Sequence, residues 1–470
     1  MKVAVIGAGW AGCAAAVALA RQQHHAIIFE AAHALGGRAR AAFTYQNQAL
    51  DNGQHILIGA YTQSLQLMQS VGIDLQRSLL ALPLCLRFPD GTGLQLPQLP
   101  PPLDAAWGIA TARGWSLHDK LSLLRAALQW RWRGFVCAPQ TTVAQLCASV
   151  SARVMAELLE PLCISALNTP ANQASGQVFL RVLQDSLFAP ASSLGAGSTL
   201  LLPRVDLSSL FPQAALQCAQ QLGAQLRLGV RVLTLQRAQA QWLVNGEAFD
   251  AVLLACSATE AARLVGALAA APELLPEPAP ESAQASEPVA AAEGAGAAPA
   301  LQPSSFAAWA HTAQALRYEA IGTVYAHAPG ARLAQPMLAL RCSAQAPAQF
   351  VFDRGQLAPE QPVLQGVLAF VVSASQGERE TLEQQVLAQG RAQLGLPALH
   401  LVQSIVEKRA TFACTPGLER PHMQIAPGLL ACGDYVAGPY PATLEGAVRS
   451  GLAAANALAM PHTKPLNRPQ

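Results

Sequence analysis

Three glycines near the start of the chain have the spacing GxGxxG and are followed by an acidic residue, Glu30. Gly7 allows a tight turn, Gly9 allows a phosphate to approach the backbone, and Gly12 allows a helix to pack closely on its strand. A carboxylate at Glu30 can accept hydrogen bonds from a ribose hydroxyl, and its charge would repel the 2′-phosphate of NADP. These residues predict a dinucleotide site.

The elements that must hold these residues are in register with them. Residues 2–6 predict a strand, residues 14–20 have the small-residue pattern of a helix, and residues 26–29 predict a second strand that ends at the acid. The N-terminus of such a helix offers free N–H groups and a partial positive charge to a pyrophosphate. A GxGxxG spacing also occurs in ordinary turns, but the whole order of elements favours a nucleotide.

A second glycine pair, Gly36 and Gly37, precedes Arg38 soon after the acid. Another close backbone approach and a cation suit the pyrophosphate of FAD, although a plain turn with a surface arginine would have the same sequence. Near the other end of the chain, a predicted strand breaks at Gly433 and Asp434 before a helix rich in small residues. The N-terminus of that helix could stabilise negative charge on a reduced flavin. FAD is therefore the predicted cofactor.

The composition bounds the class of protein. The chain has 470 residues, of which 52% are hydrophobic and 12% charged, and its mean hydropathy is +0.26. It has no apolar run of about 18 residues to span a membrane and no signal-peptide pattern. Ten scattered cysteines predict reduced thiols in a cytoplasmic protein without a metal site, and a net charge of +2 argues against nucleic acid. We expect a large apolar cavity or a position on the inner face of the cytoplasmic membrane.

Residues 107–133 contain four of the seven tryptophans, interleaved with arginines. This composition is typical of a membrane interface and predicts a peripheral membrane protein. Apolar residues at helical spacing fit equally well with a core helix that has a solvated basic end. The tryptophans are Trp107, Trp115, Trp130 and Trp132, and the spaced apolar residues are Leu117, Leu121, Leu124, Leu128 and Trp132. Both interpretations remain open at this point.

The chain resembles the superfamily of FAD-dependent amine oxidases and carotenoid desaturases and, within it, the hydroxysqualene dehydroxylases of bacterial hopanoid pathways. The narrower resemblance rests on five stretches that cover nearly the whole chain in order. They are residues 49–61 (ALDNGQHILIGAY), 166–170 (ALNTP), 203–208 (PRVDLS), 321–325 (IGTVY) and 407–412 (EKRATF). Residues 267–304 depart from the pattern, because their Ala, Pro, Glu and Ser content predicts a disordered insertion without a catalytic role.

The resemblance implies an α/β fold in which a discontinuous Rossmann-type FAD-binding domain is interleaved with an α+β substrate-binding domain. The FAD-binding domain would comprise residues 1–85, 205–266 and 400–460. The substrate-binding domain would comprise residues 86–204 and 305–399.

The resemblance also implies the contacts to FAD, position by position. Gly7, Gly9 and Gly12 would hold the pyrophosphate, Glu30 the adenosine ribose, and Gly37 with Arg38 would also approach the phosphates. The backbone of Val232, on a strand predicted at 225–235, would meet the adenine. Gly433 and Asp434 would contact the ribityl side, and Leu444 with Glu445 would begin the helix that faces the flavin.

The family reaction, on this resemblance, is the reductive removal of the hydroxyl of hydroxysqualene, a long-chain isoprenoid, to give squalene. It requires an electron donor that no motif identifies. Loss of the hydroxyl needs a proton donor. His55 is the predicted donor because its turn follows the GGR segment and an imidazole can be protonated near neutral pH. His55 would otherwise pack against the flavin or hydrogen-bond to it, and Asp51, Tyr435 and Tyr440 are weaker candidates for the donor.

Three other functions compete with the dehydroxylase reaction. A polyprenoid desaturase would run the opposite redox direction on the same scaffold. A non-catalytic protein that binds prenyl lipids would purify without colour, and the intact turn at Gly433 and Asp434 argues against it. An amine oxidase is disfavoured because the sequence shows no aromatic pair near the C-terminal glycines.

Overall fold

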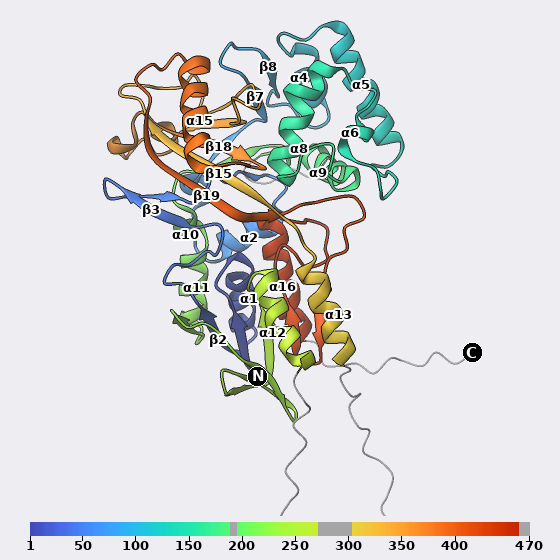
Figure 1. The fold of residues 1–470 in the computed structure, drawn as a ribbon, viewed down its shortest axis with the longest axis vertical. Helices are drawn as coiled ribbons and strands as arrows, with labels where there is room; N and C mark the ends of the chain where they lie inside the picture. The colour runs from blue at the N-terminus through green and yellow to red at the C-terminus, as the bar shows by residue number, and fades with distance from the viewer. Residues whose placement is uncertain (189–194, 271–302, 460–470) are drawn as a thin grey trace, which may run out of the picture.

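The computed structural model describes residues 1–188, 195–270 and 303–459, and its elements form two regions (Figure 1). The lower region of that view contains a mostly parallel sheet with its helices. The upper region contains a five-stranded antiparallel sheet and, beside it, a lobe of helices. Residues 107–133 and 155–188 belong to this helical lobe.

The lower sheet has six strands in the order β10-β2-β1-β14-β21-β20. All neighbouring pairs are parallel except β20 with β21. The strands are β1 (Lys2–Ile6), β2 (His25–Glu30), β10 (Gln225–Leu228), β14 (Ala251–Leu254), β20 (Gln424–Ala426) and β21 (Leu429–Ala431). Because three distant parts of the chain contribute strands, this region is discontinuous in sequence.

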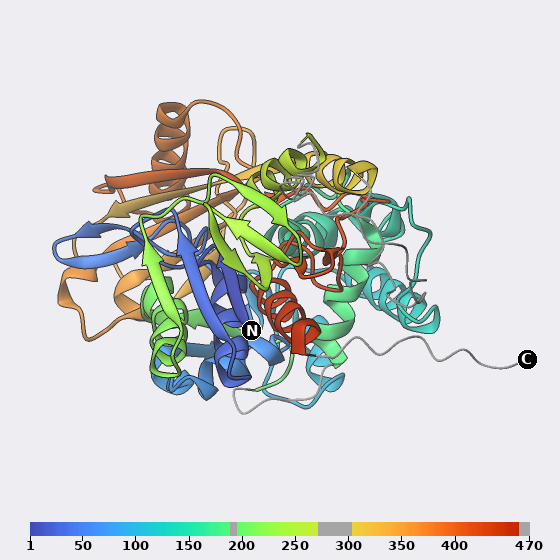
Figure 2. The ribbon, with the colours of Figure 1, turned by 90° about the horizontal axis from the view of Figure 1, so that it is seen from below.

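Alternate residues of β1 explain why both faces of the lower sheet are covered. Val3 and Val5 pack in the same cluster as the alanines of α1, whereas Ala4 and Ile6 pack with Trp242 of a small meander. Figure 2 shows this meander in green beside the blue strands. The meander consists of β11 (Leu235–Ala238), β12 (Gln241–Val244) and β13 (Glu247–Phe249).

Small residues let the helices of the lower region approach closely. Helix α1 packs against α11 and α16, and a Cβ added to Gly451 of α16 would lie 2.2 Å from the carbonyl oxygen of Ala11. The helices are α1 (Trp10–Arg21), α2 (Thr62–Ser70), α3 (Leu75–Ser78), α10 (Leu207–Leu210), α11 (Pro212–Gln221), α12 (Ala258–Ala270), α13 (Pro303–Gln314) and α16 (Leu444–Ala459).

The upper sheet has the order β16-β17-β18-β15-β19 and is antiparallel throughout. Its strands are β15 (Tyr318–His327), β16 (Met337–Ala339), β17 (Phe350–Asp353), β18 (Val367–Ser373) and β19 (His400–Phe412), with α14 (Arg354–Leu357) and α15 (Arg379–Leu394) nearby. The short pairings elsewhere are β3 (Ala41–Tyr45) with β4 (Gln48–Asp51), β7 (Cys85–Arg87) with β8 (Gly93–Gln95), and β9 (Leu200–Pro203) between β5 (Leu57–Ile58) and β6 (Leu79–Leu82).

The helical lobe begins after the proline-rich residues 97–102. It contains α4 (Leu103–Thr111), α5 (Leu117–Trp132), α6 (Val143–Leu146), α7 (Ala152–Val154), a π-helical turn η1 (Met155–Leu159), α8 (Glu160–Leu167) and α9 (Gly176–Phe188). A capping box fixes the start of α5, because Ser116 and Asp119 exchange side-chain and backbone hydrogen bonds. Within the described ranges, no helix is both long and apolar enough to cross a membrane.

Helix α5 overturns part of both interpretations of residues 107–133. The spaced leucines and Trp132, which a core helix would bury, are all exposed. The apolar residues of the buried face are Leu123, Ala126 and Trp130, so Trp130 does not belong to the exposed surface. The helix is apolar on both sides, and spacing alone therefore selects the wrong face.

Three predicted boundaries differ from the structure. Strand β19 pairs with β15, so residues 400–412 lie in the upper sheet and not with the nucleotide-binding strands. The strand predicted at 225–235 ends at Leu228, because Gly229 turns the chain with a φ of +71°. Residues 271–302 of the predicted insertion lie outside the described residues, whereas residues 267–270 and 303–304 belong to α12 and α13.

Candidate functional site

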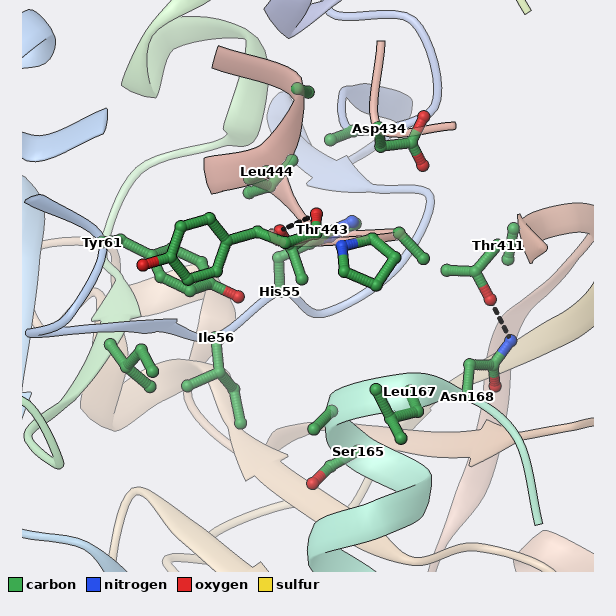
Figure 3. Close-up of a pocket in the computed structure, with 18 of the residues that line it drawn as sticks. His55, Ile56, Tyr61, Ser165, Leu167, Asn168, Thr411, Asp434, Thr443 and Leu444 are labelled. Carbon is green, nitrogen blue, oxygen red and sulfur yellow. Dashed lines mark hydrogen bonds between the residues drawn. The ribbon is translucent and has the colours of Figure 1, made fainter. Parts of the chain in front are cut away.

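One cavity of about 720 Å³ joins the two regions of the molecule. It begins at the glycine turn after β1, passes the C-terminal turn at Gly433, and ends among the helices of the lobe. Most of the predicted cofactor residues line it, and the exceptions among them are Gly12 and Glu445. Figure 3 shows the middle of the cavity, where His55, Tyr61 and Leu444 lie opposite Ser165 and Leu167 of α8.

Glycine backbone forms a cradle at the nucleotide end of the cavity. Gly7 has a φ of +113°, and a Cβ added to Gly12 would lie 1.9 Å from the carbonyl oxygen of Gly7, so both positions require glycine. Gly9 and Gly37 face each other, since a Cβ on Gly37 would lie 3.2 Å from the Cα of Gly9. No side chain caps the N-terminus of α1. This cradle, which a Cβ would fill, fits a pyrophosphate.

Glu30 is held at the rim of the cradle by two backbone amides. The N–H of Ala8 donates to Oε2 at 2.8 Å, and the N–H of Ala32 donates to Oε1 at 2.9 Å. These bonds fix the orientation of the carboxylate where it lines the cavity. Each oxygen keeps a second lone pair, so a ribose diol can still donate to it.

Arg38 ties the N-terminal glycine segment to the C-terminal turn. Its Nη2 lies 2.5 Å from Oδ1 of the buried Asp434, and its Nη1 donates to the carbonyl oxygen of Ala410 at 2.8 Å. Burial opposes the charge of Arg38, but the Asp434 carboxylate outweighs that effect and raises the pKa of Arg38. Arg38 therefore stays a cation beside the cavity, where it can meet a phosphate.

Val232 and Leu444 line the cavity, and each comes from a different element. Val232 is buried in the connection after β10, where Nη2 of Arg263 donates to its carbonyl oxygen at 2.9 Å. Leu444 is the first residue of α16, so the helix begins where the sequence predicts it. The Thr443 hydroxyl accepts from the N–H of Gly446 and fixes this helix start.

Glu445 points away from the cavity. Its fully buried carboxylate accepts from the N–H groups of Gln63 and Ser64 at the start of α2, and from the Ser64 hydroxyl at 2.6 Å. Arg449 also donates to it at 2.7 Å. The side chain therefore caps α2, and only the backbone of Glu445 remains for a cofactor contact.

His55 lines the cavity, but its protonation does not suit an acid. Its Nδ1 lies 3.2 Å from the carbonyl oxygen of Gly53, which can only accept, so Nδ1 carries the hydrogen and Nε2 has the lone pair. Burial, with the nearby Arg38 cation, lowers the pKa of His55 below its usual value. A neutral imidazole in this tautomer accepts a hydrogen bond at Nε2, which disfavours the predicted donor role.

Sequence reasoning missed Tyr61, which lines the cavity beside His55 (Figure 3). Burial, together with the charge of Glu445, raises the pKa of Tyr61, so its hydroxyl keeps its proton at physiological pH. Tyr61 is the last residue of the motif at 49–61 and directly precedes α2. This position in the motif was the signal that could have identified Tyr61 as a site residue. A phenol here can donate a hydrogen bond into the cavity.

Of the weaker proton-donor candidates, only Tyr440 lines this cavity. The carboxylate of Asp51 instead accepts from the N–H of Leu207, and burial raises the pKa of Asp51 to about 7. Tyr435 borders a second, smaller cavity of about 190 Å³ on the other side of Arg38. Burial raises the pKa of the Tyr435 hydroxyl well above its usual value.

The far end of the cavity is apolar. Strand β8, the loops beside β7 and β8, helices α4 and α5, and the η1 turn contribute only hydrocarbon or aromatic side chains there, whereas α8 and α9 add Ser165, Arg181, Asp185 and Ser186 to the cavity lining. The hydrocarbon and aromatic residues are Leu84, Leu94, Leu96, Ala105, Ile109, Leu123, Ala127, Trp130, Phe135, Leu158 and Leu159. Such a wall suits a long hydrocarbon and offers it no polar partner.

This site and fold define a flavoprotein oxidoreductase. The model of one protein family, described as flavin containing amine oxidoreductase, matches residues 10–300, and the chain belongs to this family. Its cofactor is FAD, which the backbone cradle, Glu30 and Arg38 fit. Among the described residues, no cluster of three or more His, Cys, Asp or Glu side chains could hold a metal ion.

Curated relatives of two kinds are similar to parts of the chain. A hydroxysqualene dehydroxylase of Zymomonas mobilis is 26% identical over 233 residues, which are 47% of this chain and 52% of that protein. A zeta-carotene desaturase of Zea mays is 36% identical over 74 residues, 16% of this chain and 13% of that protein. The chain thus spans about half the length of the first relative and a small part of the second.

Solved structures share the fold over almost the whole chain. An oxidoreductase from Methanosarcina mazei has a TM-score of 0.68 at 15% identity, covering 97% of this chain and 100% of that one. A putrescine oxidase has a TM-score of 0.61 at 16% identity, covering 98% and 99%. At these identities the likeness establishes an α/β FAD-binding fold and nothing about the substrate.

Proposed function

We propose that this protein removes the hydroxyl of hydroxysqualene reductively, so that an allylic alcohol and two electrons with two protons give squalene and water. The observation that carries the proposal is the continuous cavity that runs from the nucleotide cradle to a mostly apolar end. The similarity to a hydroxysqualene dehydroxylase over half of the chain supports it. Bound FAD, once reduced by an electron donor, supplies the electron pair and one hydrogen.

The chain's own residues exclude water from the far end of the cavity. Breaking an allylic C–O bond develops positive charge on carbon, which any nearby nucleophile or water would capture. Leu94, Leu123 and Phe135 present no such group to the substrate. The apolar wall thus binds the hydrocarbon chain of the substrate and keeps water from reaching the reacting carbon through that end.

The hydroxyl leaves as water only if a proton or a strong hydrogen bond reaches its oxygen. Tyr61 is the favoured donor, because its hydroxyl stays protonated and lies in the middle of the cavity. His55 accepts at Nε2 when neutral, which suits it to orient the substrate hydroxyl. In this proposal Tyr61 donates, His55 accepts, and both act on the same oxygen.

A polyprenoid desaturase is the second candidate, and the match to zeta-carotene desaturases favours it. The cations beside Tyr440 disfavour an amine oxidase. Tyr61 and Tyr440 do both line the cavity, contrary to the expectation that no aromatic pair is present. The guanidinium groups of Arg449 and Arg181 lie 4.7 and 5.5 Å from the centre of the Tyr440 ring, and these cations would repel an ammonium group.

Anaerobic single turnover tests the proposal. The purified protein is photoreduced, hydroxysqualene is added, and flavin reoxidation is followed while the products are extracted. We expect one squalene per reoxidised flavin, and no reoxidation when squalene itself is added. If hydroxysqualene does not reoxidise the reduced flavin, and a carotene precursor reduces the oxidised flavin, the reaction would be that of a desaturase.

A further inference from the structure

Exposed apolar side chains are concentrated on one face of the helical lobe. Most of the large hydrophobic residues that are exposed in the described parts of the chain lie between residues 99 and 136. Leu117 is 77% exposed, Trp132 is 87% exposed and Trp107 is 58% exposed. We call this surface the α4–α5 face; it comprises Leu99, Leu103, Trp107, Leu117, Leu121, Leu124, Leu128, Trp132 and Val136.

The exposed acidic and arginine side chains of residues 99–136 have one sign of charge, which is positive. Residues 99–136 contain only two acids, and both Asp104 and Asp119 are buried. The arginines of the same stretch, Arg113, Arg125, Arg131 and Arg133, are all exposed. Leucine and tryptophan bordered by arginine form the composition of a helix that lies in a membrane interface.

The α4–α5 face is the outer side of a wall whose inner side lines the cavity. Leu123 and Trp130 of α5 and Ile109 of α4 border the apolar end of the cavity, while Leu121 and Leu128 of the same helix α5 face outward. In Figure 1, α5 lies at the outer edge of the lobe and α4 lies beside it. Only one layer of helix therefore separates the face from the substrate end.

A second copy of the chain is a poorer occupant of this face than a bilayer. In a two-fold dimer the same surface meets itself, so the exposed arginines of both copies would be brought together without exposed acids to neutralise them. An anionic bilayer offers phosphates to Arg113, Arg125 and Arg133 and hydrocarbon to the leucines.

We propose that the α4–α5 face docks onto the surface of an anionic lipid bilayer, with its leucines and tryptophans in the acyl boundary and its arginines at the phosphates. The docking deepens the proposed function by giving an isoprenoid substrate a short path from the bilayer to the cavity. The contact itself does not depend on which reaction the cavity carries out.

Vesicle flotation tests the docking with the purified full-length holoprotein. Vesicles of phosphatidylcholine with phosphatidylglycerol are compared with vesicles of phosphatidylcholine alone. We expect the double variant Leu128→Ser/Trp132→Ser to lower partitioning at least about 10-fold. The matched control Leu222→Ser/Leu233→Ser removes two exposed leucines of the nucleotide-binding region and should leave partitioning unchanged.

Charge reversal and oligomeric state complete the test. Arg125→Glu/Arg133→Glu should weaken binding to the anionic vesicles by about 25-fold, and salt should weaken the wild type. Wild-type protein that does not float, or a control pair that weakens flotation as much as the first pair, would overturn the docking.

A different result would identify a second copy as the occupant. In that case Leu128→Ser/Trp132→Ser would convert a dimer to a monomer in size-exclusion chromatography with light scattering, while flotation stayed unchanged. All of these variants should reoxidise their flavin at the wild-type rate with hydroxysqualene supplied in detergent. If flotation behaves as expected but neither the wild type nor any variant converts hydroxysqualene, the proposed reaction would be refuted. The docking would still stand.

Discussion

The two ends of the cavity are built from different parts of the polypeptide. At the nucleotide end the backbone itself forms the surface, and Gly7, Gly9 and Gly37 are there because a Cβ would collide with neighbouring backbone or fill the cradle. At the apolar end the surface consists of side chains such as Leu94 and Trp130. A backbone cradle tolerates almost no substitution, whereas an apolar wall tolerates many that conserve volume.

The first prediction sharpens this contrast within one turn. Gly12→Ala places a Cβ 1.9 Å from the Gly7 carbonyl oxygen, so we expect a loss of about 3 kcal/mol of unfolding free energy and no bound flavin. Gly9→Ala meets no protein atom nearer than 3.9 Å and should fold normally while losing flavin, because its methyl group occupies the phosphate cradle. Flavin absorbance and thermal unfolding of both variants measure the difference.

A Gly12→Ala protein that retains full flavin would show that the helix and strand can separate at little cost. A Gly9→Ala protein that does not fold would show that the cradle is needed for the fold as well as for the cofactor.

This contrast also explains what the sequence could predict. The glycines, Glu30 and Arg38 have few substitutes, so their types and order predict the nucleotide cradle without knowledge of the rest of the chain. Tyr61 and Leu94 line the same cavity only in the folded protein, because they come from elements far apart in sequence. Residues of their kinds occur elsewhere in the chain. The substrate end could therefore be expected as an apolar cavity but not drawn residue by residue.

The second prediction compares the two faces of α5, which the sequence could not tell apart. Trp130→Ala removes a buried ring that lines the cavity and should lower the unfolding free energy by about 3–5 kcal/mol. Trp132→Ala removes an almost fully exposed ring and should change it by less than about 0.5 kcal/mol. Chemical denaturation followed by flavin fluorescence measures both. Equal losses of unfolding free energy in the two variants would mean that the Trp132 ring is packed, and not exposed, in solution.

The reason for this ambiguity lies in the composition of α5. A helix with one apolar stripe shows its buried face directly, but Leu121 and Leu123 lie on opposite sides of α5 and are equally apolar. The spaced leucines gave the more regular pattern and were the exposed set. The regular spacing predicted the helix correctly. The core interpretation of that spacing would bury the wrong side of it.

The third prediction concerns the polar groups between the two ends. Tyr61→Phe should keep its flavin and slow single-turnover reoxidation about 100-fold, because the leaving oxygen loses its hydrogen-bond donor. His55→Ala should slow it less, about 10-fold, since a neutral His55 only orients the hydroxyl. Stopped-flow absorbance on matched flavin content measures both rates. A larger effect at His55 than at Tyr61 would restore His55 as the proton donor.

The smallest effect is expected at Asp51, where the two regions meet. Its carboxylate accepts from Leu207 in the lower region, and its carbonyl oxygen accepts from the Tyr325 hydroxyl of the upper sheet at 2.8 Å. Burial raises the pKa of Asp51 from 3.8 to about 7. The folded protein thus binds this proton more tightly than the unfolded chain, so stability falls as pH rises from about 4 to 7.

Asp51→Asn keeps an oxygen for the Leu207 amide and cannot ionise, so it should match the wild type near pH 4 and melt about 2–4 °C higher at pH 8. Asp90 provides a control of opposite sign. Its partial burial is outweighed by hydrogen bonds from Thr92 and Arg341, which lower the pKa of Asp90 to about 2. Asp90→Asn should therefore be less stable than the wild type at pH 8, and the difference should shrink as pH falls toward 2. Melting curves of the three proteins between pH 2 and 8 decide the matter. If Asp51→Asn melts below the wild type at pH 8, the carboxylate is ionised and favourably bound there, and the joint between the two regions is held by charge.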